Sequence, residues 1–465
     1  MIELYLIAVP LIFALLIFFS RKSTVIRLLL VTAGCFHIGG VFALFAMPQY
    51  IPVLLEGWIG SDLPAKIIIA VCSALFCASA VNAFFWIPSA RRFEGEYPTM
   101  PEYIFCSALC VFLSTMSLVV FAGNFGLLWV AVEATTLASA PLIAYHRSPG
   151  ALEAMWKYLV ICSVGIGLAL FGIFMLGVAM RFSSGAEGLG FAEIAAVKEK
   201  LDPQWFKAAF LFCLAGFGLK MGLAPFHVWL PDAHSEAPSL VSVLLSGSLL
   251  NCSFLGIIRV MEVSPEALLP FCREYLFAFG LLSLFVAACF IIRQHDFKRM
   301  LAYSSVEHMG IIAMLWGLQA NEAAMIHLAS HSACKMILFL TAGNILLAFG
   351  TRKCAAVNGM FSRMPLTALI WLGGILFICG VPPSPLFVTE LILVQHAGTT
   401  AGSIILVLLF AVFCGMTAIA MKMTMGRMEN VPSDGAVTAA SRLSLLPALL
   451  CVIPAAAGLY LVFQI

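Results

Sequence analysis

The chain has 465 residues, of which 62% are hydrophobic and only 10% are charged, and its formal net charge is +2. This composition excludes an ordinary soluble domain and is typical of a polytopic membrane protein, and the small net charge does not indicate nucleic-acid binding. The 15 cysteines include no Cys-x-x-Cys pair, and the chain has no phosphate-binding glycine loop. We therefore expect no cofactor: no zinc or other metal, no iron–sulfur cluster and no nucleotide.

Runs of about 20 apolar residues predict an all-α membrane protein with fourteen transmembrane helices. They cover residues 2–20, 25–47, 65–88, 104–122, 124–146, 153–181, 205–224, 235–261, 273–294, 297–318, 322–349, 366–395, 401–424 and 444–463. The eighth, eleventh and twelfth spans are expected to be irregular. The first span is expected to be retained, because it lacks a basic leader and is followed by Arg21 and Lys22.

The basic residues between the spans predict the orientation of the chain. Sixteen lysines and arginines fall at the odd-numbered connections and seven at the even-numbered ones. The odd connections are therefore expected to be cytoplasmic, with both termini on the outer side. The long sixth connection, residues 183–204, is expected to hold a short interfacial helix.

Two spans contain helix breakers. Gly222 and Pro225 interrupt the seventh span, and Pro382 and Pro383 interrupt the twelfth. Breaks five spans apart favour two five-helix units, a common plan in transporters. The predicted parts are residues 1–103 (spans 1–3), 104–262 (spans 4–8), 263–425 (spans 9–13) and 426–465 (span 14).

Among the charged residues inside predicted spans, Glu133, Lys220, Lys335 and Glu390 are the ones that we single out. One such charge at the membrane centre costs about 2.5–3.5 kcal/mol. A distributed set favours a charge-transfer path, in which Glu133 is the counter-ion of Lys220 and controls whether the lysine holds its proton. A static buried ion pair is the alternative.

Histidines accompany these charges. His327, His331 and Lys335 are four residues apart and share one helix face, which suits proton transfer. A metal site and ordinary core histidines are the alternatives. His308 is a further relay candidate, with Ser304 one turn before it, whereas Glu307 is expected to face a different environment. His227 lies at the first break, and His37 is interpreted as structural.

Three motifs resemble hallmarks of the antiporter-like, proton-translocating membrane subunits of complex I. They are Phe217-Gly-Leu-Lys220-Met-Gly-Leu-Ala-Pro-Phe-His227, Phe297-Lys-Arg-Met-Leu-Ala-Tyr-Ser-Ser305 followed by His308-Met-Gly, and His331-Ser-Ala-Cys-Lys335-Met-Ile-Leu-Phe-Leu. Within this family, Trp129-Val-Ala-Val-Glu133-Ala-Thr-Thr-Leu is most similar to the F subunit of hydrogenase-4, a membrane-bound nickel–iron hydrogenase of the formate hydrogenlyase type. The resemblance spans about residues 100–425 and implies fourteen helices with two inverted five-helix repeats.

The resemblance also implies roles for particular residues. Glu133 and Lys220 match the family's glutamate–lysine pair, and His308, Lys335 and Glu390 fall where further relay residues occur. Relatives often carry a lysine in the eighth span, where this chain has Asn251, an amide that can only hold water on the path. The chain is further expected to lack the long lateral helix of the largest members.

The sequence thus predicts a subunit that moves protons across the prokaryotic inner membrane, while partner subunits facing the cytoplasm carry the electrons. The predicted path runs through Glu133, Lys220, water near Asn251, His308 and the face from His327 through His331 to Lys335, and leaves near Glu390. Two alternatives from one class are a subunit of a multi-subunit sodium/proton antiporter and a subunit of an NADH–quinone oxidoreductase. A structural scaffold with idle, paired charges is the third.

Overall fold

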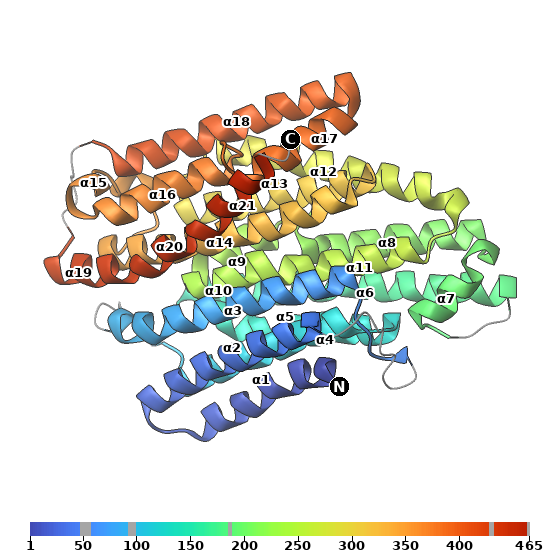
Figure 1. Cartoon of the computed structure of the whole chain (residues 1–465), viewed down its shortest axis with the longest axis horizontal. Coiled ribbons are helices and arrows are strands. Elements are labelled where there is room, and N and C mark those ends of the chain that lie inside the picture. The colour runs from blue at the N-terminus through green and yellow to red at the C-terminus, as the bar shows by residue number, and fades with distance from the viewer. Residues whose placement is uncertain (47–56, 92–98, 185–187, 427–431, 463–465) are drawn as a thin grey trace. The chain divides into compact units, whose positions relative to one another are not determined.

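The structure is a computed structural model that describes residues 1–46, 57–91, 99–184, 188–426 and 432–462. These residues form helices joined by short connections, with isolated bridges but no strands among them (Figure 1). The all-α fold class is therefore confirmed. Eleven helices in the described ranges are long and apolar enough to cross a membrane, and two more apolar helices are shorter. The total of fourteen spans stays a prediction.

The chain divides into two compact units, each built from separate stretches of sequence. Unit 1 comprises Met1–Cys77, Thr99–Trp229 and Ser248–Leu276, and unit 2 comprises Ala78–Pro98, Leu230–Gly247 and Phe277–Ile465. Four helices therefore contribute residues to both units: α3 (Leu63–Ala90), α9 (Trp229–Glu236), η3 (Leu245–Leu249) and α12 (Leu269–Ile291). The predicted four-part division and the five-helix repeats stay predictions.

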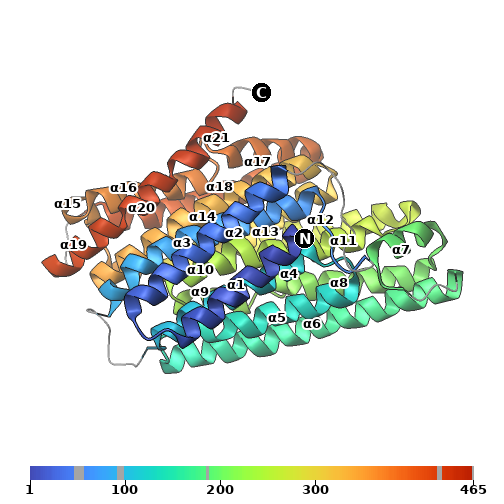
Figure 2. The same ribbon diagram turned by 60° about the horizontal axis from the view of Figure 1, so that its bottom comes forward.

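Unit 1 holds the first eight helices of the chain and two later segments. Its helices are α1 (Ile2–Phe19), α2 (Ser23–Ala46), the first half of α3 (Leu63–Ala90), α4 (Glu102–Phe121), α5 (Phe125–Ile143), α6 (Pro149–Ser184), α7 (Phe191–Val197), η2 (Lys198–Lys200), α8 (Pro203–Met221), α11 (Leu250–Glu262), η4 (Glu266–Leu268) and the start of α12 (Leu269–Ile291). The helix α6 runs beside α8, and α1 lies beside α2 and α4 (Figure 1 and Figure 2).

Unit 2 holds the later helices. They are α9 (Trp229–Glu236, from its second residue), α10 (Ser239–Leu244), the π-turn η3 (Leu245–Leu249, to Gly247), α13 (Phe297–Gly317), α14 (Asn321–Phe349), η5 (Cys354–Ala356), α15 (Met360–Arg363), α16 (Pro365–Ile378), α17 (Pro385–His396), α18 (Gly398–Thr424), α19 (Asp434–Leu443), α20 (Leu445–Leu450) and α21 (Val452–Val462). Within this unit, α14 packs against α10, α13, α16 and α17.

Side-chain caps fix where several of these helices begin. The Asn124 carboxamide oxygen accepts the Leu127 N–H over 2.7 Å at the start of α5. The Asp202 carboxylate accepts two backbone N–H groups at the start of α8, where Pro203 occupies the first helical position. Asp296 does the same for α13. These caps satisfy donors that a helix leaves unpaired at its first turn.

Glycines allow two close helix contacts near the candidate site residues. In unit 1, a Cβ at Gly216 of α8 would lie 2.5 Å from the Gly165 carbonyl oxygen of α6. In unit 2, a Cβ at Gly280 of α12 would lie 2.5 Å from the Gly310 carbonyl oxygen of α13. Only glycine permits this approach, as at many membrane helix crossings. The contacts fix the height of Lys220, one turn after Gly216, and of the residues around Gly310.

Both predicted helix breaks are present. The helix α8 ends at Gly222, whose φ of 86° is left-handed, and turns that include Pro225 follow. The helix α16 ends at Ile378, and α17 begins at Pro385 after a turn that contains Pro382 and Pro383. Proline lacks the N–H that would continue either helix, so the chain must leave helical geometry at these positions.

The remaining expectations on the spans have mixed outcomes. The eighth span is irregular, because a π-turn follows α10. The eleventh is not, since α14 runs without a break over 29 residues, so that prediction was wrong. The last helical run begins at Asp434, ten residues earlier than predicted. A short helix, α7, occupies part of residues 183–204, as predicted. Residues 185–187 lie outside the described residues, and so do Arg92 and Arg427, which were counted among the basic residues of the connections.

Candidate functional site: buried lysines in two polar chains

Glu133 on α5 and Lys220 on α8 share one hydroxyl group in unit 1. The Thr136 hydroxyl donates to Glu133 Oε2 over 3.3 Å, and the Lys220 ammonium donates to the same Thr136 oxygen. Glu133 Oε1 also accepts a 2.7 Å hydrogen bond from the Ser163 hydroxyl of α6. The two charged groups are therefore joined through a threonine rather than by a direct salt bridge.

The ammonium group of Lys220 is fully enclosed. Lys220 has no exposed surface, and its Nζ lies 5.4 Å from the centre of the Tyr158 ring, a cation–π distance. The Tyr158 hydroxyl is itself held 2.7 Å from Ser139 Oγ. Glu133, in contrast, is half-buried. The Lys220 charge is thus stabilised by the Thr136 hydroxyl, by the face of the Tyr158 ring and, through the Thr136 hydroxyl, by the Glu133 carboxylate.

The break after α8 positions His227. The Gly222 N–H closes the helix on the carbonyl oxygens of Gly218 and Leu219, and the Trp229 indole donates to the Leu219 carbonyl oxygen over 2.9 Å. His227 lies between these anchors and is 8% exposed. Gly222 and Pro225 therefore act on the backbone, whereas His227 is the titratable group of this segment.

Asn251 lies on α11 and is completely buried. Within unit 1, α11 packs against α4, α5 and α8, the helices that surround the Lys220 end of the polar chain. The neighbouring Cys252 interacts electrostatically with Lys220, so this turn of α11 faces α8. The structure places Asn251 in a closed interior, and its role on a proton path stays a prediction.

Lys335 on α14 is a buried lysine of unit 2. It has no exposed surface, and its ammonium donates to the Leu301 carbonyl oxygen over 2.5 Å and to the Ser304 hydroxyl. Glu307, on the next turn of α13, is 3% exposed and interacts electrostatically with Lys335. Glu307 therefore faces Lys335, whereas His308, the next residue, contacts His327. Ser304 binds Lys335, whereas sequence reasoning placed it beside His308.

The three histidines of α13 and α14 form one cluster. His308 Nδ1 lies 3.0 Å from His327 Nε2, and His327 Nδ1 lies 2.7 Å from Thr389 Oγ1 on α17. The His331 ring centre is 5.1 Å from that of His308. His327 and His331 therefore share the α14 face that the four-residue spacing predicted.

Thr389 sets the tautomers in this cluster. Its hydroxyl donates to the Leu386 carbonyl oxygen over 2.9 Å, so it accepts a hydrogen bond from His327 Nδ1. A neutral His327 then accepts at Nε2 from His308 Nδ1–H. The His308 ring also interacts with the backbone of Ile378, where a carbonyl oxygen accepts from it. The cluster therefore joins two imidazoles and a hydroxyl in one hydrogen-bonded chain.

Glu390 lies over the break between α16 and α17. A Cβ at Gly380, whose φ is 69°, would lie 2.3 Å from Glu390 Oε2, so only glycine leaves room for this carboxylate. Glu390 also interacts electrostatically with Glu307. The turn that carries Pro382 and Pro383 therefore holds a carboxylate within electrostatic range of the Lys335 partner.

Sequence reasoning missed several members of these chains. Thr136 lies three residues after Glu133 on the same helix face, a spacing that could have revealed it. Thr389 immediately precedes Glu390, but nothing local links it to His327. His234 of α9 is completely buried, and its ring stacks 5.0 Å from the Phe339 ring, which also lies 5.9 Å from Lys335 Nζ. Thr389 and His234 lie on helices other than those of the residues that they contact.

His37 lies apart from the candidate site. Its ring nitrogens lie 3.0 Å from Ser73 Oγ and 3.1 Å from Ser117 Oγ, so α2 is tied to α3 and α4 in unit 1. Both nitrogens thus have fixed partners, which fits the structural interpretation of this histidine.

Comparison with known proteins identifies the family. Residues 122–417 match the family described as "NADH:quinone oxidoreductase/Mrp antiporter, TM". The chain belongs to this family. Membership of this family confirms the resemblance to antiporter-like subunits. Together with the apolar helices, it identifies the chain as a multi-pass integral membrane protein.

One relative is similar in sequence, and two solved structures share the fold. The chain is 35% identical over 318 residues to the hydrogenase-4 component F homolog of Methylacidiphilum infernorum (isolate V4), a match that covers 67% of this chain and 64% of that protein. A chain of the membrane-bound sulfane sulfur reductase, an archaeal respiratory membrane complex, has the same fold with a TM-score of 0.85 at 21% identity, over 98% of this chain and 94% of that one. A chain of the Mrp complex from Dietzia sp. DQ12-45-1b has the same fold with a TM-score of 0.84 at 17% identity. That match covers 100% of this chain and 95% of the other.

Proposed function

We propose that this chain translocates protons as one membrane subunit of a hydrogenase-4-like or related respiratory complex in a prokaryotic cytoplasmic membrane. Partner membrane subunits adjoin it, and partner subunits facing the cytoplasm carry the electrons. The observation that carries the proposal is a constellation that occurs once in each unit: a fully buried lysine, a hydroxyl that accepts from it, and a glutamate.

The two constellations are chemically alike. In unit 1, Thr136 accepts from Lys220 and donates to Glu133. In unit 2, Ser304 accepts from Lys335, and Glu307 lies within electrostatic range on the next turn. A buried ammonium is costly unless it is paired, so a nearby carboxylate controls whether the lysine keeps its proton. A change of charge at either glutamate would then release or recapture a proton at the lysine.

The unit 1 chain offers a direct route for that proton. A hydroxyl can accept one hydrogen bond while it donates another, so Thr136 can pass a proton from Lys220 toward Glu133 without moving its oxygen. Glu133 is half-buried, so its carboxylate can exchange the proton with water or with an adjoining subunit. The chain therefore joins an enclosed proton carrier to an accessible one.

The unit 2 chain adds proton acceptors. His308 and His331 are both buried and interact electrostatically with Lys335, so they give the chain two imidazoles. Imidazole exchanges protons near neutral pH, which suits a relay between lysine and glutamate. The continuous path from Lys220 past Asn251 to this cluster, and an exit near Glu390, are part of the proposal.

A lysine exchange tests the proposal. We expect Lys335→Met to abolish or strongly reduce proton uptake into inverted membrane vesicles, because the side chain keeps its bulk but can no longer hold a proton. Uptake is followed with a pH-sensitive dye and normalised to the amount of chain in the membrane. The matched control is Lys157→Met, a lysine whose side chain is 48% exposed and pairs with Glu153 over 2.7 Å on the surface of α6.

The outcomes separate the alternatives. Normal uptake by a fully assembled Lys335→Met complex would refute proton transfer through this lysine and favour a structural scaffold. Uptake by the wild type only when sodium is present, in the absence of any electron donor, would instead assign the chain to a sodium/proton antiporter. Lys157→Met should behave as the wild type in both assays.

A further inference from the structure

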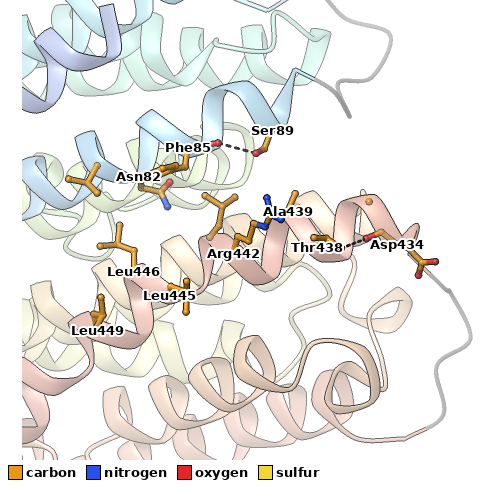
Figure 3. A pocket seen from close by; sticks show the side chains of 13 residues that line it. Asn82, Phe85, Ser89, Asp434, Thr438, Ala439, Arg442, Leu445, Leu446 and Leu449 are labelled. Atoms are coloured by element: carbon orange, nitrogen blue, oxygen red, sulfur yellow. Dashed lines mark hydrogen bonds between the residues drawn. The ribbon is translucent and has the colours of Figure 1, made fainter. Parts of the chain in front are cut away.

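A groove of about 880 Å³ lies in unit 2 between the second half of α3 and the helices α19 and α20 (Figure 3). This volume is typical of small-molecule sites, which measure about 300–1,000 Å³. Most of its wall is apolar and comprises the side chains of Val81, Phe85, Leu443, Leu445, Leu446 and Leu449. The proton-transfer residues of the preceding sections do not line it.

The groove contains a cation without a partner. Arg442 lines the groove and is exposed, and its side chain makes no ion pair or hydrogen bond with any residue in the described part of the chain. Its side chain extends from α19 toward α3 (Figure 3). The acid among the lining residues, Asp434, is already bound to Arg363 over 2.6 Å. The guanidinium is therefore available to an anionic group of a ligand.

A buried amide faces the same space. Asn82 is only 4% exposed and lines the groove from α3, and its side chain forms no hydrogen bond with any described residue. A side-chain amide that lines a groove without a protein partner is available for hydrogen bonding to a ligand there. The carboxamide can donate to an ester carbonyl or accept from a hydroxyl.

The groove has a polar end and an apolar end, which matches the headgroup and the acyl chains of a lipid. Ser89 and Thr438 lie toward one end and Leu449 toward the other (Figure 3). The polar end is where α3 ends, directly before Arg91 and Arg92 in the sequence, and the distribution of basic residues predicts that this end faces the cytoplasm. Basic pockets between transmembrane helices on that side suit anionic lipid headgroups.

We propose that this groove binds one anionic phospholipid, with its phosphate on Arg442, its ester region at Asn82 and its acyl chains along the leucines of α20. A guanidinium forms two parallel hydrogen bonds to a phosphate, which gives the site its preference for charge. The leucines contribute hydrophobic burial, which a soluble phosphate compound could not obtain. The lipid would thus stabilise the packing of α19 and α20 against α3.

Native mass spectrometry of the purified full-length chain in detergent tests this inference. The chain is titrated with dioleoyl phosphatidylglycerol, and in parallel with dioleoyl phosphatidylcholine, whose headgroup carries no net charge. We expect one retained phosphatidylglycerol, bound about tenfold or more tighter than phosphatidylcholine. Free sn-glycerol 3-phosphate should not displace it, because it has no acyl chains.

Two variants and a control separate the contributions. Arg442→Gln should weaken phosphatidylglycerol binding by about tenfold or more and remove the preference over phosphatidylcholine. Ala439→Phe, which places a ring in the groove, should weaken both lipids. Arg293→Gln changes an exposed arginine of the same unit outside the groove and should alter neither.

Three results would overturn the inference. Unchanged phosphatidylglycerol binding by Arg442→Gln would remove the arginine from the site. Equal affinity of the wild type for the two lipids would remove the charge preference. Efficient cross-linking of Leu446→Cys to another polypeptide in the assembled complex would show that a partner helix, rather than a lipid, fills the groove.

Discussion

Replacement of Thr136 by valine tests the relay in unit 1 with little change in volume. The substitution removes the oxygen that accepts from Lys220 and donates to Glu133. A hydrogen bond to a charged group contributes about 1.5–3 kcal/mol. If that contribution is lost at the transition state of proton transfer, the rate should fall about 10- to 150-fold.

Thr136→Val leaves the charges in place. Two hydrogen bonds of about 3 Å each put the carboxylate and the ammonium within about 6 Å of one another. At an effective dielectric of about 20, their attraction is then about 3 kcal/mol. Since the variant keeps both charges, it separates loss of the hydroxyl from loss of the ion pair, which Glu133→Gln would remove.

Dye-detected proton uptake by inverted vesicles measures the effect, with membrane abundance determined in parallel. Thr135→Val is the matched control, because Thr135 is equally buried on α5 but its hydroxyl donates only to the Val132 carbonyl oxygen over 2.6 Å. We expect slow uptake for Thr136→Val and near-normal uptake for Thr135→Val, at similar abundance. Equal uptake by the two variants would refute a relay through the Thr136 hydroxyl.

Three further predictions concern other parts of the chain. Ser304→Ala removes the hydroxyl that accepts from the buried lysine of α14 and should slow proton uptake about tenfold or more, whereas Ser305→Ala, whose hydroxyl contacts Ser246, should not; equal uptake by both would exclude this hydroxyl. Arg259→Met should destabilise the detergent-solubilised chain by about 1–3 kcal/mol in thermal melts, because Arg259 binds Asp62 at 2.5 Å and 2.9 Å. Burial raises the pKa of Asp62, but the Arg259 guanidinium has the larger effect, so the pKa is lowered in the folded chain. The stabilisation is therefore present above about pH 3.9 and is lost as the pH falls through the lower folded pKa. A difference in stability between variant and wild type that persists undiminished in acid would contradict this. The predicted topology places the carboxyl end on the outer side, so a fluorescent protein fused after Ile465 should stay dark. Fluorescent cells would show that the carboxyl end is cytoplasmic and contradict the topology.

Residue patterns alone located the helices and both breaks. Apolar runs predicted the spans because a helix in lipid must satisfy its own backbone and present apolar side chains. Pro225 and Pro383 marked the interruptions because proline cannot donate a backbone hydrogen bond, and that property does not depend on tertiary packing. Charges such as Lys220 and Lys335 were recognisable as candidate site residues because a charge is rare in an apolar span.

Partner choice could not be predicted from spacing. Helical periodicity places Glu307 about 100° from His308, but it does not say which helix faces each side, and the packing of α14 brings Lys335 to Glu307. Likewise, Thr389 could be recognised as a member of the cluster only from the packing of α17 beside α14, which brings its hydroxyl within hydrogen-bond distance of His327.

The sequence by itself therefore determined where this chain is helical, where its helices break and which buried groups can hold a proton, since each follows from local backbone chemistry and hydrophobicity. Only the tertiary structure decided how those groups are connected. The hydroxyl of Thr136 between Glu133 and Lys220, and the groove at Arg442, depend on contacts between helices that are far apart in the sequence. Such contacts are set by the rotation and height of each helix against its neighbours, which small residues and side-chain packing fix together rather than one residue at a time.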